Sequence, residues 1–278
     1  MGQPSVEVLL DRTRTAWRGG GPRPIRVYLW RPPADGPRPA VLLTHGSGGV
    51  AADLDWVAED LLGRGFLVAA VEHHGNNLVD EQLEEGFSFW WERAPDLSFV
   101  LDHLMATERV GRVGVLGYSL GGYTAAALLG ARIDPDRYRR LRSGEPILPV
   151  PEDRPNIRAE LDALTRRYGE ESLQQRALAD HRDDRFTAAV LLAPAIAPIL
   201  QDSSLAAILR PVLVRWGGAD EIEPDGMRYA ELIPGADGAT SGPDVGHLAF
   251  CGNDQDGTAA RAAALQEIGP FFGRHLDR

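Results

Sequence analysis

The sequence has 278 residues, 44% hydrophobic and 25% charged, which is the composition of a soluble globular protein with room for one large α/β domain or two small ones. Its formal net charge of −11 repels phosphate backbones and anionic lipids, so we expect neither nucleic acid nor a membrane as a partner. All 29 basic residues are arginine, which excludes Schiff-base chemistry, a Ser-Lys dyad and a P-loop lysine.

The single cysteine and the N-terminal segment bear on disulfides, zinc binding and cellular location. Cys251 has no second cysteine in the chain, so an internal disulfide and a cysteine-rich zinc site are both excluded. Residues 1–14 are polar and charged and lack the apolar segment of a secretory signal, so we expect a cytoplasmic location.

Short apolar runs alternate with amphipathic stretches along the chain, which predicts a mostly parallel sheet with helices on both faces. Residues 6–10 and 25–30 predict an antiparallel pair of strands at one edge. Runs rich in Val, Leu and Ala, most of them bounded by Gly or Pro, predict buried parallel strands at 40–44, 66–71, 112–116, 187–192 and 211–216. Apolar residues at helical spacing, or small apolar residues throughout, predict helices at 53–63, 96–105, 119–131 and 258–275.

Residues 132–185 interrupt this alternation. The segment is charged and rich in proline, and it contains helical stretches at 157–168 and 171–179. Structureless loops of this length are uncommon inside compact domains. We therefore interpret 132–185 as an inserted, mainly helical cap, with the core formed by 1–131 and 186–278. The alternative is a solvated surface segment without substrate contact.

A G-x-S-x-G motif, Gly117-Tyr118-Ser119-Leu120-Gly121, lies between the strand that ends at Leu116 and the helix that follows. The chain must turn sharply there, and glycine on both sides of the serine leaves room for the crowded backbone. Such a turn presents the hydroxyl over the edge of the sheet, with the amino end of a helix aimed at it. This setting predicts Ser119 as a nucleophile; the alternative is a serine that only caps a helix.

A serine nucleophile needs a base, and the base needs an acid that holds its tautomer. Where such a serine lies at a strand-turn-helix, the carboxylate and the histidine follow it in that order. Asp220 ends a short loop after the strand 211–216, and His247 lies in a loop after the last predicted strand. We therefore predict Ser119, Asp220 and His247 as the catalytic residues. The competing carboxylates are Glu221, Glu223, Asp225 and Asp244.

The negative charge that develops on an attacked carbonyl oxygen needs preorganised donors. The N–H of Leu120, directly after the nucleophile, is the first candidate. The second is the N–H of Ser47, in the glycine-rich loop at residues 44–49 that follows an early strand. The alternatives for this loop are a simple tight turn and a phosphate-binding loop, but it lacks the G-x-G-x-x-G spacing.

The run of residues 86–91 is the densest aromatic patch in the chain. Such a run forms either core or a pocket wall; as a pocket wall it would suit an apolar or aromatic substrate group. Trp90 and Trp91, together with Tyr118, are the candidate substrate-binding residues. Adjacent histidines such as His73 and His74 diverge, so no metal site is predicted, and no cofactor is expected.

Together these residues resemble the α/β-hydrolase superfamily, and more narrowly its dienelactone hydrolase-like branch, which adjoins bacterial relatives of platelet-activating factor acetylhydrolase. The resembling stretches span nearly the whole chain except the insert: 28–32, 44–49, 94–101, 117–122, 193–195, 217–220 and 246–250. The resemblance implies the α/β-hydrolase fold and ester-type hydrolysis. True dienelactone hydrolases carry cysteine as the nucleophile, where this chain has Ser119, and many relatives in the branch are exported.

The residues and the resemblance together predict a cofactor-free serine hydrolase that cleaves a small-molecule carboxylic ester or lactone through an acyl-enzyme. Two alternatives stay open. The same triad could act on an amide or thioester, or transfer or cyclise an acyl group in a biosynthetic pathway. In the second alternative, the chain is a ligand-binding protein that keeps the fold but does not catalyse a reaction. The expected partner is a small ester-type molecule, and a homodimer is left open.

Overall fold

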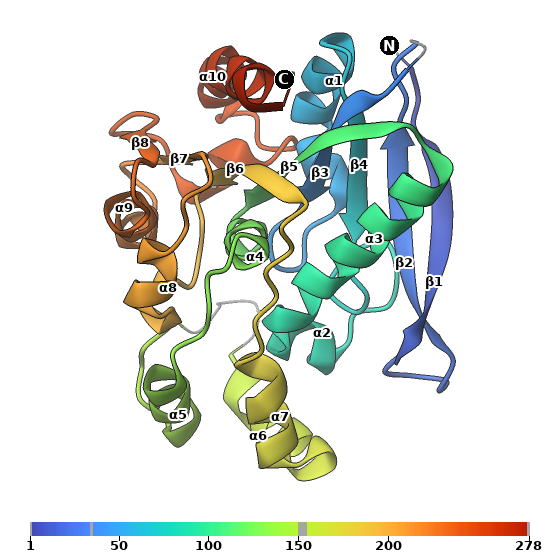
Figure 1. Cartoon of the computed structure of the whole chain (residues 1–278). Helices are drawn as coiled ribbons and strands as arrows, with labels where there is room; N and C mark the ends of the chain where they lie inside the picture. Colours follow the sequence, from blue (N-terminus) through green and yellow to red (C-terminus); the bar gives the residue numbers. More distant parts are fainter. Residues whose placement is uncertain (1, 34–35, 150–154, 277–278) are drawn as a thin grey trace.

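The apolar runs of the sequence form one eight-stranded sheet in the computed structural model, which describes residues 2–33, 36–149 and 155–276 (Figure 1). The strand order across the sheet is β1-β2-β4-β3-β5-β6-β7-β8. In chain order the strands are β1 (Ser5–Thr15), β2 (Pro22–Trp30), β3 (Arg38–Thr44), β4 (Leu67–Glu72), β5 (Val110–Tyr118), β6 (Phe186–Leu192), β7 (Val212–Trp216) and β8 (Asp237–Thr240).

Strand β2 runs antiparallel to both of its neighbours, β1 and β4, whereas every other adjacent pair is parallel. The predicted antiparallel edge pair is therefore confirmed, with Val8 of β1 opposite Arg26 of β2. The parallel strands from β4 to β8 all end at the same edge of the sheet. The loops that follow these ends are consequently neighbours in space, which is where ligands bind in open α/β sheets.

Helices cover both faces of this sheet. They are α1 (Asp55–Gly63), α2 (Glu84–Ser88), α3 (Arg93–Thr107), α4 (Leu120–Leu128), α5 (Pro135–Ser143), α6 (Ile157–Tyr168), α7 (Glu170–Ala177), α8 (Asp202–Ala206), α9 (Glu223–Leu232) and α10 (Thr258–Leu276). Four 3₁₀ turns join them in the described part of the chain: η1 (Ala51–Leu54), η2 (Trp90–Glu92), η3 (Ala197–Ile199) and η4 (His247–Phe250).

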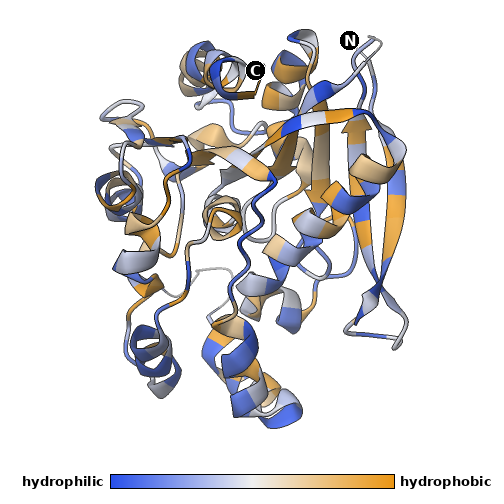
Figure 2. Ribbon diagram, in the orientation of Figure 1, coloured by the Kyte–Doolittle hydropathy of each residue, from blue (hydrophilic) through white to orange (hydrophobic). Residues whose placement is uncertain are grey.

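Side chains alternate between the two faces along each strand. In β3, Ala40 and Leu42 join the core under α3, α4 and α9, whereas Val41 and Leu43 join the core under α1 and α10. Figure 2 shows apolar residues concentrated in the central strands and in α4. Because α4 is buried along its whole length, it holds the turn that precedes it at a fixed place over the sheet.

The structure also contains elements that the sequence did not predict. Strand β8 consists of four exposed residues, Asp237 to Thr240, without an apolar run that could reveal it. Helices α2 and α8 are only five residues long, and α9 begins inside the acidic run that follows Asp220. The predicted helix 53–63 is divided into η1 and α1.

The predicted insert, 132–185, contributes α5, α6 and α7 and no strand in the residues described, and its residues 150–154 lie outside them. These helices contact α2, η2 and η3, which follow the carboxyl ends of β4 and β6 (Figure 1). Buried Leu164 and Leu173 attach α6 and α7 to the core on the α3 and α4 side. The insert therefore lies against elements at the carboxyl edge of the sheet.

Candidate active site

Ser119 lies at the turn between β5 and α4, with φ 55° and ψ −119°. This is a strained conformation for a residue with a side chain, and it persists because the surroundings fix it. The Ser119 N–H donates to the Leu192 carbonyl at 2.9 Å, and its carbonyl accepts from Gly122 at 2.8 Å and from Ala195 at 3.1 Å. The hydroxyl stays partly exposed at the carboxyl edge of the sheet.

The two glycines of the motif are required by close backbone approach. A Cβ atom on Gly117 would lie 1.9 Å from the Gly121 carbonyl oxygen, and one on Gly121 would lie 2.0 Å from the Thr44 carbonyl oxygen. Both distances are far below any contact between a methyl group and an oxygen. Glycine therefore allows β3, β5 and α4 to meet at Ser119.

His247 lies between Ser119 and Asp220 and forms a hydrogen bond with each. The Ser119 hydroxyl and the His247 Nε2 are 2.9 Å apart, as are the His247 Nδ1 and the Asp220 Oδ2. In the tautomer that satisfies both bonds, Nδ1–H donates to the carboxylate and Nε2 accepts from the hydroxyl. The structure thus brings the three predicted catalytic residues together in the geometry that activates a serine.

Backbone hydrogen bonds join the loops that carry Asp220 and His247. The N–H of Ala219 donates to the Val245 carbonyl at 2.9 Å, and the N–H of Gly218 donates to the Gly242 carbonyl at 2.9 Å. A Cβ atom on Gly217 would lie 1.9 Å from the Val245 oxygen, so glycine is required here as well. This pairing fixes the spacing between carboxylate and imidazole without help from a substrate.

The competing carboxylates have other positions. Asp220 is buried, and its second oxygen accepts from the Ile222 N–H at 2.9 Å. Asp225 lies in α9 and accepts from the Ala197 N–H at 3.0 Å, while burial raises its pKa to about 6. Glu221 and Asp244 are exposed. Of the described acidic residues, Asp220 is the one hydrogen-bonded to His247.

The loop with Ser47 passes close to Ser119. A Cβ atom on Gly46 would lie 3.3 Å from the Ser119 Cβ and 3.2 Å from the Tyr118 ring, so a larger residue there would be tight against both. Ser47 follows on the exposed side, and Leu120 begins α4 on the other. The amino end of α4 adds a favourable potential for negative charge at this point.

The three candidate substrate-binding residues are placed differently. Tyr118 is buried; its hydroxyl donates to the His247 carbonyl at 3.1 Å, and its ring lies 5.4 Å from the imidazole, centroid to centroid. Trp91 is 1% exposed and Trp90 9%, and both pack in the aromatic core with Phe89. The aromatic run therefore forms core, and substrate contact by these three residues stays a prediction.

A polar network that the sequence did not reveal lies beneath the site. His45 and His73 are fully buried, and burial holds the pKa of both imidazoles below the ordinary value. His73 donates to Asp96 at 3.0 Å and accepts from the Thr44 hydroxyl at 2.8 Å. Arg93 and Asn76 are also buried, and both bond to the loop that carries Ser47. His45, His73 and Asn76 follow strand ends, which could have drawn attention to them, whereas Arg93 and Asp96 lie in α3 and carry no such signal.

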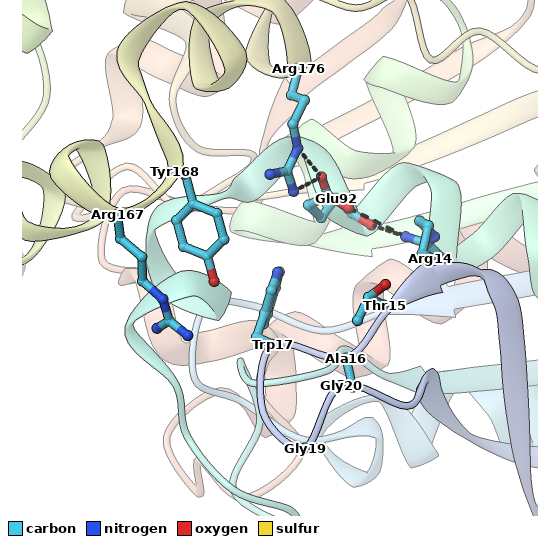
Figure 3. A pocket seen from close by; sticks show the side chains of 10 residues that line it. All are labelled: Arg14, Thr15, Ala16, Trp17, Gly19, Gly20, Glu92, Arg167, Tyr168 and Arg176. Carbon is cyan, nitrogen blue, oxygen red and sulfur yellow. Dashed lines mark hydrogen bonds and ion pairs between the residues drawn. The ribbon is translucent and has the colours of Figure 1, made fainter.

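A cavity of about 670 Å³ lies between the β1–β2 turn, η2 and the insert (Figure 3). Its wall includes Trp17 and Tyr168, with Arg14 and Arg176 both directed at Glu92. Arg176 meets the Glu92 carboxylate at 2.6 Å. None of the three predicted catalytic residues lines this cavity.

Metal binding, thiol reactivity and membrane crossing can each be compared with the described residues. No group of three or more His, Cys, Asp or Glu side chains there is arranged to hold a metal ion. Burial raises the pKa of the Cys251 thiol to about 11, so this cysteine stays protonated and is a poor nucleophile at neutral pH. None of the described helices has the length and apolar character needed to cross a membrane.

No family model and no curated protein matches the sequence. Solved structures do match the fold along nearly the whole chain. Ferulic acid esterase from Streptomyces cinnamoneus aligns with a TM-score of 0.65 and 21% identity, covering 99% of this chain and 90% of that one. Thermogutta terrifontis esterase 2, phosphorylated by paraoxon, aligns with a TM-score of 0.61 and 15% identity over 98% and 95% of the two chains.

Dienelactone hydrolase from Anabaena variabilis also matches, with a TM-score of 0.55 and 18% identity over 99% of this chain and 100% of that one. At such identities the likeness concerns the fold. It agrees with the strand order, the single antiparallel strand inside the sheet and the strand-turn-helix at Ser119. The predicted fold class is therefore confirmed: this chain has the α/β-hydrolase fold.

Proposed function

We propose that the chain hydrolyses carboxylic esters of small molecules, lactones included, with Ser119, His247 and Asp220 as its catalytic triad. The observation that carries the proposal is the pair of 2.9 Å hydrogen bonds that join Ser119 to His247 and His247 to Asp220. The structural neighbours named for ferulic acid esterase, esterase and dienelactone hydrolase activity support the same reaction class.

In the first half-reaction, the Ser119 Oγ attacks the ester carbonyl while His247 Nε2 takes the hydroxyl proton. The carbonyl π pair moves onto oxygen, and the N–H groups of Leu120 and Ser47 stabilise this oxyanion. The pair then returns, the bond to the alcohol oxygen breaks, and His247 gives its proton to the departing alcohol. Asp220 holds the imidazole tautomer and stabilises its cation.

In the second half-reaction, water attacks the acyl-enzyme while His247 takes one of its protons. Collapse of the tetrahedral intermediate breaks the bond to Ser119, and the proton returns to the serine oxygen. The products are the carboxylic acid and the free enzyme. All atoms come from ester and water, so the reaction needs neither a cofactor nor a metal.

We also propose that the insert, 132–185, is a cap that helps to shape the substrate site. Its helices contact α2, η2 and η3 at the carboxyl edge of the sheet, where Ser119 lies. Lids in this position exclude water and select substrates in many enzymes.

The direct test is Ser119→Ala, measured against a panel of p-nitrophenyl esters of increasing acyl length and labelled with a fluorophosphonate probe. We expect loss of at least about 1,000-fold in kcat and complete loss of labelling, with an unchanged thermal transition. Ser203→Ala, on the exposed side of α8, is the matched control and should behave like the wild type. Turnover by Ser119→Ala at the wild-type rate would contradict the proposal.

A further inference from the structure

A fully buried arginine, Arg93, lies beneath the loop that carries Ser47. It is 1% exposed and is the first residue of α3. Its guanidinium donates to the His45 carbonyl, to the Thr44 hydroxyl oxygen at 3.3 Å and to the Asn76 Oδ1 at 2.7 Å. The guanidinium thus holds the segment just before Ser47.

Asn76 holds the segment just after Ser47. The same Oδ1 that accepts from Arg93 also accepts from the Gly48 N–H at 3.0 Å. Asn76 is itself 1% exposed, and its N–H donates to the His73 carbonyl at 3.0 Å, so it cannot follow the loop outward. Ser47 is therefore exposed, yet it is anchored on both sides by buried groups.

The same guanidinium reaches the other half of the proposed oxyanion hole. Its Nε donates to the Thr124 hydroxyl oxygen at 3.2 Å, and that hydroxyl donates to the Leu120 carbonyl at 3.1 Å. Thr124 is completely buried in α4. A single side chain, Arg93, consequently connects the first turn of α4 with the loop over the nucleophile.

This arrangement costs free energy. In the described part of the chain, no carboxylate forms an ion pair with Arg93, and its acceptors are neutral oxygens. Burial lowers its pKa to about 9, so the guanidinium still carries its charge at neutral pH. The Asp96 and Glu72 carboxylates attract this charge from a distance. A buried charge whose hydrogen-bond acceptors are all neutral is still expensive, and a hydrophobic side chain could fill the space at lower cost. Packing alone therefore does not explain an arginine here.

We propose that Arg93, together with Asn76 and Thr124, sets the distance between the two N–H donors of the oxyanion hole, at Leu120 and Ser47. They are positioning residues, because they act through the backbone that carries these donors. The inference rests on the function proposed above. Because oxyanion donors act only at the correct distance, displacement of one should slow acylation and leave ground-state binding unchanged.

The test uses Thr124→Val, which removes the hydroxyl at nearly constant shape, Thr124→Ser, which restores it, and Asn76→Ala. Three quantities are measured: the second-order rate of Ser119 labelling by a fluorophosphonate, kcat and KM for p-nitrophenyl acetate, and inhibition by 2,2,2-trifluoroacetophenone, which forms a charged tetrahedral adduct. The labelling rate requires no knowledge of the natural substrate.

We expect Thr124→Val and Asn76→Ala to lower the labelling rate, kcat and inhibitor affinity together by about 10- to 100-fold, with KM changed less than about threefold. Thr124→Ser should recover most of the loss. Arg215→Met is the control, because Arg215 is also buried but pairs with Glu267 and Asp237. It should lower the unfolding temperature and leave labelling and inhibition at wild-type values.

Wild-type labelling and inhibition in both Thr124→Val and Asn76→Ala would overturn the inference. Equal losses in Thr124→Val and Thr124→Ser would overturn it too, since they would indicate a packing effect. If Ser119→Ala is inactive while these variants behave like the wild type, the inference fails and the proposed hydrolysis stands. If the wild-type Ser119 cannot be labelled at all, both fail.

Discussion

Ser119 shows how local strain and chemistry are linked at the scale of single residues. Its backbone lies at φ 55°, and the neighbouring Gly117 and Gly121 have no room for a Cβ atom. The strain is maintained by hydrogen bonds from the Ser119 N–H and to its carbonyl, and it directs the hydroxyl toward His247. Single residues thus determine where the Ser119 hydroxyl points.

Glu72 illustrates a different effect of burial on a single residue. It is 1% exposed, at the end of β4, and it accepts from the Ala51 N–H at 2.9 Å. Its second oxygen lies 3.5 Å from the Nε2 of His45. Burial raises the pKa of the Glu72 carboxyl from 4.5 to about 7.

The shift predicts how stability depends on pH. The folded state keeps the Glu72 proton while the unfolded chain loses it, so Glu72 lowers the free energy of unfolding as pH rises from 4.5 to about 7. Glu72→Gln removes this titration. We expect the variant to gain up to ~3 kcal/mol relative to the wild type between pH 4.5 and pH 8, measured by urea unfolding. Exposed Glu59→Gln is the matched control, and a difference for Glu72→Gln that does not change with pH would contradict the assignment.

Among the secondary-structure elements, the short turn η4 carries His247 and packs against α10. Arg261 of α10 is 8% exposed and donates to the carbonyls of Ala249 at 2.9 Å, Cys251 at 2.6 Å and Asp254 at 2.6 Å. These carbonyls lie at or after the end of a short 3₁₀ turn, where no further helical turn follows directly. The Arg261 guanidinium supplies donors to them instead. Arg261, which does not contact Ser119, Asp220 or His247 through any of these bonds, thereby fixes the segment that follows His247.

We therefore expect Arg261→Met to loosen η4. Loss of hydrogen bonds from a charged donor should lower the free energy of unfolding by about 2–3 kcal/mol, and kcat should fall more than KM rises because His247 is less well positioned. Chemical denaturation and steady-state kinetics on p-nitrophenyl acetate measure the two effects. Exposed Arg274→Met on the same helix is the control, and equal behaviour of the two variants would exclude the anchoring role.

In the whole molecule, two carboxylates on the core side, buried Glu85 and half-buried Glu92, join α6 and α7 to the core in addition to the apolar contacts of Leu164 and Leu173. Glu85 of α2 accepts from Arg167 Nη1 and from the Tyr168 hydroxyl, both at 2.8 Å, while Arg176 bonds to Glu92 (Figure 3). Most of the polar attachment of α6 therefore depends on Glu85, which is 4% exposed.

Glu85→Ala should release the end of α6 from the core. We expect faster backbone hydrogen exchange over residues 157–177, with little change in the sheet, because the strands keep their own contacts. Glu84→Ala, at the exposed neighbouring position of α2, provides the control. Unchanged exchange over 157–177 in Glu85→Ala would show that apolar packing alone holds the insert.

Much of this molecule could be predicted from its sequence. The strand runs, the amphipathic helices and the turn at Ser119 are local patterns, because apolar periodicity and glycine spacing are written in consecutive residues. Strand β8 cannot be predicted in this way, because its four residues are all exposed and include no apolar alternation. Helix α9 cannot either, because its start is a run of acidic residues that carries no apolar pattern.

The fold class, the nucleophile candidate and the order Ser119, Asp220, His247 can be predicted without a structure, since each follows from local pattern and chain order. The three-dimensional arrangement was needed to show that Asp220, and not a neighbouring carboxylate, faces His247. It also decided that the aromatic run is core and that Arg93 lies beneath the Ser47 loop. These contacts join residues far apart in the chain, and no periodicity in the sequence records which distant side chain will fill a given space.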